Sequence, residues 1–373
     1  MGKELKESLK VSPFFLFFLI HGTQTGVGLL GFQTKIFRGA EQDAWVSILL
    51  VGAAFHIIGV LMYFLLKHAR NGDIMSLHKE LFGRWMGNIL NLLLYSYCIL
   101  IVSIVIRSYL EVLMTWVFPS TPLWILSFIL LIVIVNIVKG GFRVITGICF
   151  WGVILPSFLF FSVYYLIKYA HWSNLLPLFN HGIHDYFVSA KDSMLSFLGP
   201  EFLLIYYPYI KNNLHSQKWF HFGMGYTTLL YFLVAIFTFV YFSHGQLLHT
   251  VWPTLIMSKI IRFPFIERFE YVYIFTWVLV FLPTCCIAVW GGVRILKESI
   301  GMKPDITLWV SVILIQMIVT LCKDTIDVNK VESVTNLFSS IFLFTYLPVL
   351  SLWVFIRNKL KRTNKEITNL NPS

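Results

Sequence analysis

Long apolar stretches, separated by short polar connections, run through the whole chain. A helix needs about 20 apolar residues to cross a bilayer, and ten stretches come close to that length. The pattern predicts ten membrane-spanning helices, at approximately 11–37, 44–67, 87–118, 122–138, 144–167, 186–210, 219–243, 270–293, 305–321 and 333–356. The connection 244–269 has apolar pieces that are too short and too charged to cross, so we expect short surface helices there.

Two of the predicted helices are interrupted. The first breaks at the sequence HGTQTGVG, residues 21–28, and the sixth at SFLGPE, residues 196–201. Glycine weakens a helix and proline removes a backbone donor, while lipid offers no partner for the backbone groups that are freed. A broken helix is therefore tolerated only where protein or a cavity surrounds it.

The two breaks occupy matching places in two sets of five helices. Because five is odd, the sets enter the membrane from opposite sides and form an inverted repeat, over about 11–167 and about 186–356. Paired Gly- and Pro-interrupted helices in the two halves of such a repeat indicate a binding site between them. The alternative is that each break is only a kink.

A site built from broken helices has a definite chemistry. Free N–H groups at the start of a half-helix attract a carboxylate, and free carbonyls at the end of one accept from an ammonium. Gly26 and Gly28 let a ligand approach the backbone closely. The predicted ligand is an amino acid or another small polar solute with donors and acceptors.

Composition agrees with a chain surrounded by lipid. Of the 373 residues, 57% are hydrophobic and 13% are charged, whereas soluble domains carry about 25% charged residues. The five cysteines lie in or at the end of apolar runs, so we expect buried thiols without disulfides. His181 and His184 lack convincing further metal ligands and are expected in a solvated loop. The sequence predicts no enzyme, no cofactor and no metal site.

Charge sets the expected orientation. With ten helices both termini share one side, and 19 of the 29 Lys and Arg residues fall in the loops of that side. Because cytoplasmic loops carry the basic excess, residues 1–10 and 357–373 are predicted to be cytoplasmic tails. The net charge of +11 then reflects orientation and contact with anionic membrane lipid. It does not indicate nucleic-acid binding, since no domain with a single basic face is present.

The sequences QTGVGLL in the first break and GPE in the sixth, with ten spans in 373 residues, resemble the B subunits of bacterial spore germinant receptors. These belong to the amino acid/polyamine/organocation transporter superfamily, and the resemblance covers the whole chain. It implies an all-α membrane fold like that of the leucine transporter. It also implies a place in the spore inner membrane beside an A subunit and a lipoprotein C subunit. The implied function is to bind a small nutrient, whether amino acid, sugar or nucleoside, and to trigger germination.

In such folds the ligand contacts helices one, three, six and eight. Transferred by position, the predicted ligand-binding residues are Gln24, Thr25, Gly26, Val27, Gly28, Tyr97, Ile101, Ser196, Phe197, Leu198, Gly199, Pro200, Glu201 and Thr284, with Pro283 beside the last. Glu201 is the only acid well inside a predicted helix. It is expected either to serve a ligand or a proton, or to hold free N–H groups of the break.

The other polar positions also have two interpretations each. Tyr97 either offers its hydroxyl to the ligand or packs, and Thr284 either faces the site or bonds to a carbonyl of its own helix. Arg107 and Glu111 are four residues apart and are expected to form a structural ion pair, with an outer gate as the alternative. His21 is expected to cap the first half-helix, or to have a ligand or pH role.

Two function classes remain, a nutrient-sensing receptor subunit and a proton-coupled secondary transporter. Some proton-coupled relatives place a lysine in the fifth helix against the first break, but here the only lysine of that helix is Lys168, at its outer end. A sodium site needs oxygen ligands, and Cys285 and Cys286 beside Thr284 suit sodium poorly. Fold alone does not decide between the classes, and the missing coupling groups favour sensing.

Overall fold

The computed structural model of the chain describes residues 6–261 and 267–370, except for the side chains of residues 162–163 and 361–370. This part of the chain is helical and contains no β-strand, only an isolated bridge between Val11 and Ile210. The α-helices are α1 Phe15–Gln24, α2 Phe32–Ala40, α3 Trp45–His68, α4 Ile74–Trp116, α5 Leu123–Lys139, α6 Phe142–Ile154, α7 Val163–Ile167, α8 Ile183–Met194, α9 Leu203–Tyr206, α10 Gln217–Tyr241, α11 His244–Leu248, α12 Pro253–Ser258, α13 Glu270–Ile300, α14 Pro304–Leu321, α15 Thr325–Ile341 and α16 Leu347–Leu370.

Most of the predicted membrane segments are present as helices. Within the described residues, seven helical segments are long and apolar enough to cross a bilayer, namely Trp45–His68, Ile74–Trp116, Phe142–Ile167, Asn213–Tyr241, Glu270–Ile300, Pro304–Leu321 and Thr325–Leu360. The helices α1 and α5 are apolar but shorter. The sixth predicted segment is divided into α8, α9 and 3-10 turns, so no single piece of it has the length of a span.

Three stretches depart from the uninterrupted helices that hydropathy predicts. In α4, Gly83 has a φ of +77°, a conformation that glycine adopts readily, so the third span starts after this kink. The fifth segment leaves the α-helix after Ile154 and forms 3-10 turns over Pro156–Ser162, where proline removes a donor. A π-helical turn, Phe342–Tyr346, joins α15 to α16, which continues to Leu370.

The connection 244–269 forms two short helices, α11 and α12, as predicted. However, α12 is not a surface helix, because Leu255 and Met257 are buried and the helix packs against α10 and α13. Residues 262–266 of this connection lie outside the described residues.

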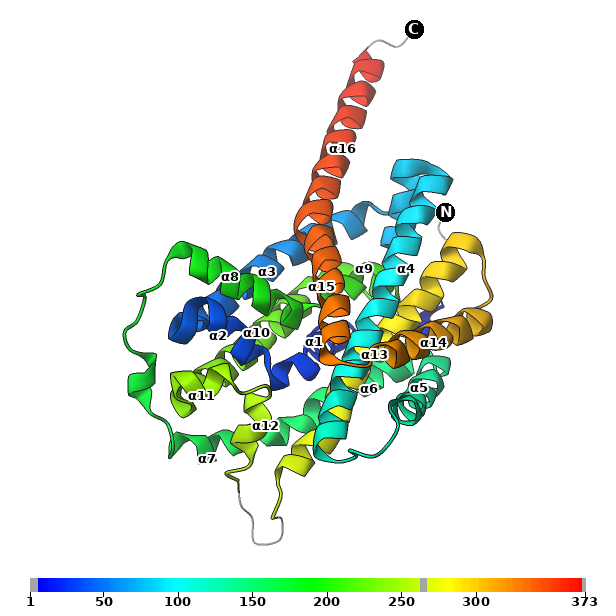
Figure 1. Cartoon of the computed structure of the whole chain (residues 1–373). Helices are drawn as coiled ribbons and strands as arrows, with labels where there is room; N and C mark the ends of the chain where they lie inside the picture. Colours follow the sequence, from blue (N-terminus) through cyan, green and yellow to red (C-terminus); the bar gives the residue numbers. More distant parts are fainter. Residues whose placement is uncertain (1–5, 262–266, 371–373) are drawn as a thin grey trace.

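The helix α13 forms the centre of the bundle and lies along α4 (Figure 1). Ten consecutive residues, 280–289, are buried, which is expected of a helix that is apolar on all sides. Gly152 lets α6 approach closely, since a Cβ at this position would lie 2.5 Å or less from the Leu279 carbonyl oxygen. In contrast to the buried α13, the C-terminal part of α16 extends out of the helix bundle (Figure 1).

The first and sixth segments are joined on both sides of their breaks. Before α1, the Val11 N–H donates to the Tyr209 carbonyl (2.9 Å) and the Val11 carbonyl accepts from Lys211 N–H (2.9 Å). On the other side of the breaks, α2, which follows the first break, packs on α8, which precedes the sixth. There the Ser189 hydroxyl donates to the Ile36 carbonyl (2.6 Å). These contacts hold the two breaks side by side.

Candidate ligand-binding cavity at the two broken helices

The first break begins later than its sequence suggests. His21–Gln24 remain helical, and the chain becomes extended only at Thr25 and Gly26 before the 3-10 turn Val27–Leu30. The sixth segment breaks where predicted, with Leu198 extended and Gly199 at a φ of +129°. The prediction of two breaks is confirmed, and the start of the first is corrected by one helical turn.

The two breaks contact each other directly. The Gln24 side-chain amide donates to the Phe197 carbonyl (3.0 Å). Gly199 lies so close to α1 that a Cβ there would be 2.5 Å from the Thr23 carbonyl oxygen. Only glycine combines this close approach with a positive φ, which explains why the motif carries glycine at position 199.

Side chains of neighbouring helices donate hydrogen bonds to the backbone carbonyls at the end of α1 and in the break, in place of the N–H groups that a continuing helix would supply. The Thr284 hydroxyl donates to the Thr23 carbonyl (3.0 Å), the Tyr231 hydroxyl to the Gln24 carbonyl (3.1 Å) and the Trp277 indole N–H to the Gly26 carbonyl (3.1 Å). The last carbonyls of a helix have no partner within it, and a membrane supplies none. The break is therefore stabilised by α10 and α13.

A cavity of about 250 Å³ opens beside the two breaks. Nine of the predicted ligand-binding residues line it, namely Gln24, Gly26, Val27, Gly28, Ile101, Ser196, Leu198, Gly199 and Thr284. The buried side-chain oxygen of Gln24, Oε1, has no hydrogen-bond partner within the described part of the chain. Because an unpaired buried acceptor costs about 1–3 kcal/mol, this oxygen is ready to accept from a ligand donor.

Five predicted residues do not belong to the lining of this cavity: Thr25, Tyr97, Phe197, Pro200 and Glu201. Tyr97 and Glu201 form a pair behind the break, where the Tyr97 hydroxyl donates to Glu201 Oε1 (2.6 Å). The other carboxylate oxygen accepts from the Gly199 N–H (2.8 Å). Of the two interpretations of Glu201, these contacts match the one in which the carboxylate holds a free N–H of the break.

The sequence analysis did not predict the part of the cavity lining that α15 forms, nor the charged residues of the lining. The additional lining includes Thr23, Lys35, Glu111, Asp192, Tyr231, Thr325, Val328, Asn329, Glu332 and Thr335. The α15 residues recur at the spacing of one helix face, a signal that was available in the sequence. Lys35 forms an ion pair with Glu332 across the cavity wall.

For His21 and Thr284 the structure excludes one of the two interpretations each. The His21 ring does not cap its half-helix, because Nδ1 bonds to the Thr227 hydroxyl on α10 (2.8 Å). The His21 carbonyl instead accepts from the backbone and hydroxyl of Thr25. Thr284 does not bond to its own helix, since its hydroxyl reaches α1.

The Arg107–Glu111 pair is confirmed as a structural contact. Arg107 Nη1 lies 3.5 Å from Glu111 Oε2, and its Nε donates to the Cys322 carbonyl at the end of α14 (2.8 Å). The pair thus joins α4 to the connection after α14. All five cysteines are buried and free, as expected.

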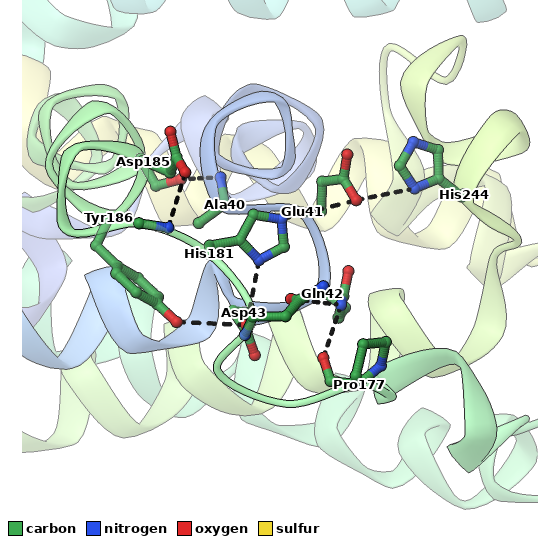
Figure 2. A network of polar contacts seen from close by, with 12 residues as sticks. Ala40, Glu41, Gln42, Asp43, Pro177, His181, Asp185, Tyr186 and His244 are labelled. Atoms are coloured by element: carbon green, nitrogen blue, oxygen red, sulfur yellow. Dashed lines mark hydrogen bonds and ion pairs between the residues drawn. The ribbon is translucent and has the colours of Figure 1, made fainter.

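A polar network lies where α2 ends (Figure 2). The buried Asp43 Oδ2 accepts from the Asn180 N–H (3.1 Å) and the Tyr186 hydroxyl (3.3 Å), and lies 3.2 Å from His181 Nδ1. Glu41 Oε2 lies 3.6 Å from His244 Nδ1. The expectation of a solvated loop is wrong for His181, whose side chain is 14% exposed, and correct for His184, at 87%.

Replacing Asp43 by alanine should destabilise the fold by about 2–4 kcal/mol, because it removes a buried acceptor and leaves its donors unpaired. Thermal unfolding of the purified protein in detergent measures this effect. Glu41→Ala is the matched control, since that side chain is 44% exposed and exposed ion pairs contribute about 0–1 kcal/mol. Equal unfolding temperatures for the two variants would contradict the interpretation.

Comparison with known proteins identifies several similar chains. The family model described as "Spore germination protein" matches residues 10–329. The chain is 37% identical over 360 residues to the spore germination protein GerQB of Bacillus cereus, covering 96% of this chain and 100% of that protein. It is 24% identical over 370 residues to the spore germination protein A2 of Bacillus subtilis (strain 168), covering 96% and 98%.

A solved structure shares the fold. MhsT in complex with L-phenylalanine matches 95% of this chain and 99% of its own, with a TM-score of 0.57 at 13% identity. At this identity the likeness shows the fold alone. It confirms the all-helical, leucine-transporter-like architecture that the resemblance implied.

Proposed function

The chain belongs to the spore germination protein family, and we propose that it senses a nutrient as the B subunit of a germinant receptor. In this proposal a small polar nutrient binds in the cavity of about 250 Å³ between the two broken helices. The observation that carries the proposal is the convergence of both breaks on this cavity, with the unpaired Gln24 Oε1 among its lining residues. MhsT holds L-phenylalanine in its solved complex, which supports an amino acid as the first nutrient to test.

We propose that ten segments cross the membrane as a five-plus-five inverted repeat. The seven long apolar segments, the shorter α1 and α5, and the divided sixth segment make up the ten. Both termini are then cytoplasmic, because the loops on their side carry the basic excess. The membrane is the spore inner membrane, as the family implies.

The signal is proposed to pass through a change in the population of two conformations. A ligand shifts such an equilibrium only if it binds one conformation more tightly. The paired half-helices α2 and α8 border the cavity through Lys35 and Asp192, so their closure over a ligand is a direct candidate for the change. Receptor A and C subunits are the proposed partners, with the basic loops and the 244–269 connection as contact regions.

The alternative is a proton-coupled secondary transporter. Residues 142–167 contain no lysine, and Lys168 follows α7 at an exposed position, so the fifth segment places no ammonium at the first break. Liposomes that contain the purified chain alone separate the two functions. Sensing predicts no concentrative uptake of L-alanine, D-glucose or inosine, whereas concentrative uptake of one of them would establish transport.

Filling the cavity should abolish the response to the nutrient. Ser196 lines the cavity and is partly buried, so Ser196→Trp places an indole in the ligand space. Spores producing this variant should need at least about 100-fold more nutrient to germinate, equivalent to about 2.7 kcal/mol of lost binding. Germination of variant and wild-type spores is compared over a panel of L-alanine, D-glucose and inosine.

The matched control is Ser96→Trp, which introduces the same side chain at an exposed position of α4. It should leave both abundance and response unchanged. A normal response from Ser196→Trp spores with normal protein abundance would refute this assignment of the nutrient site.

A further inference from the structure

A second cavity, of about 280 Å³, lies on the other side of the first break. It is lined by residues from the end of α1 and the 3-10 turn that follows it, α6 and the 3-10 turns after it, α7, α10, α12 and α13. It shares no lining residue with the cavity described above. The two cavities are therefore separate spaces that flank one broken helix.

The walls of the second cavity are apolar and aromatic. Its lining includes Phe160, Tyr226, Phe237, Tyr273 and Trp277, and the rings of the last two stack with centroids 6.2 Å apart. No Asp, Glu, Lys or Arg belongs to the lining formed by the described residues. An ion placed there would lose its hydration without gaining a partner, so the cavity selects against charged molecules.

One buried side chain supplies a directed polar group. His21 is 4% exposed and lines the cavity. The Thr227 hydroxyl donates its hydrogen to the Gly223 carbonyl (2.9 Å), so its oxygen accepts from His21 Nδ1 at 2.8 Å. In the neutral ring the hydrogen is then on Nδ1, and Nε2 is an acceptor.

No hydrogen-bond partner for His21 Nε2 is found in the described part of the chain. Three hydroxyls of the lining do not supply one, because each already donates to a carbonyl: Ser157 to Ile154, Ser258 to Leu255 and Thr254 to Leu29. An occupant with an O–H or N–H donor would satisfy this nitrogen. A lipid acyl chain carries no such donor.

We propose that this cavity binds a small uncharged molecule, mostly apolar, whose single O–H or N–H group donates to His21 Nε2. Aromatic alcohols are the simplest members of this class. The site is independent of the proposed nutrient site, because it has its own lining and its own polar group. Its occupant contacts Trp277, whose indole holds the Gly26 carbonyl of the first break.

Binding of 4-fluorobenzyl alcohol to the full chain in phosphatidylcholine nanodiscs tests the proposal. Fluorine NMR separates saturable binding from partition into lipid, which empty nanodiscs measure. We expect saturable binding to the wild type and its loss in Val234→Trp, which fills the cavity from α10. Leu229→Trp is the matched control, since position 229 is on the same helix, 52% exposed and outside the lining.

The donor requirement has its own test. 4-Fluorotoluene, which lacks the hydroxyl, should bind the wild type about tenfold more weakly than the alcohol, as expected for one hydrogen bond to a buried group. In His21→Phe the two probes should bind equally. Non-saturable binding, equal binding to Val234→Trp, or equal affinity of both probes for the wild type would overturn the proposal. If Val234→Trp does not fold, Val280→Phe fills the same cavity from α13.

Discussion

Replacing Gly199 by alanine is expected to remove most of the folded protein from the membrane. The residue has a φ of +129°, which costs about 1–3 kcal/mol for a residue with a side chain. The new Cβ would also lie 2.5 Å from the Thr23 carbonyl oxygen, so the two breaks would have to separate. We expect a total cost of at least about 3 kcal/mol.

Membrane abundance and the unfolding temperature of the purified protein measure this effect. Gly28→Ala is the matched control in the other break, because its Cβ would lie 3.5 Å from Ser196 Oγ, an ordinary contact. Gly28 does not have a positive φ, so this variant should be close to wild type. A Gly199→Ala protein as abundant and as stable as Gly28→Ala would show that the breaks do not depend on their close approach.

Replacing Glu201 should separate stability from response. The carboxylate is 2% exposed and accepts from two donors, the Tyr97 hydroxyl and the Gly199 N–H. Glu201→Ala leaves both neutral donors unpaired, and since each unpaired buried donor costs about 1–3 kcal/mol, the total cost is expected to be about 2–6 kcal/mol, with a strong fall in abundance. Glu201→Gln keeps one acceptor and should cost about 1–3 kcal/mol.

The glutamine variant carries the functional test. Its amide oxygen accepts from one of the two donors and its NH2 faces the other, so either the Tyr97 hydroxyl must turn to accept or the Gly199 N–H loses its acceptor. Gly199 lines the proposed nutrient site. We expect a shifted germination dose–response at an abundance near that of wild type. Tyr97→Phe removes one donor and serves as the comparison. If Glu201→Gln spores respond normally at normal abundance, the contact of Glu201 with the break has no part in sensing.

The parts of the fold that the sequence predicted correctly depend on local properties. Hydropathy over about 20 residues indicated the apolar helices, and the glycines and proline near positions 26 and 199 indicated the breaks. Nine of the predicted ligand-binding residues line one cavity, because the two breaks lie beside each other. The unexpected 3-10 turns at Pro156–Ser162 also follow from a local cause, the proline.

The interpretations that the sequence left open were decided by contacts between residues that are far apart in the sequence. His21 bonds to Thr227, 206 residues away, and Thr284 bonds to Thr23, 261 residues away. Hydropathy indicated that these residues lie in membrane segments, but it gave no information about which side chain or carbonyl each one would hydrogen-bond to.

By itself, then, the sequence determined that this protein is an all-helical membrane chain with two paired breaks and a single buried acid beside the second. Only the tertiary structure decided that Glu201 lies behind the break, that α15 walls the proposed nutrient site and that a second cavity exists. The physical reason is that helix formation and burial in lipid follow from neighbouring residues. A cavity and its free acceptors arise only where several distant helices pack together.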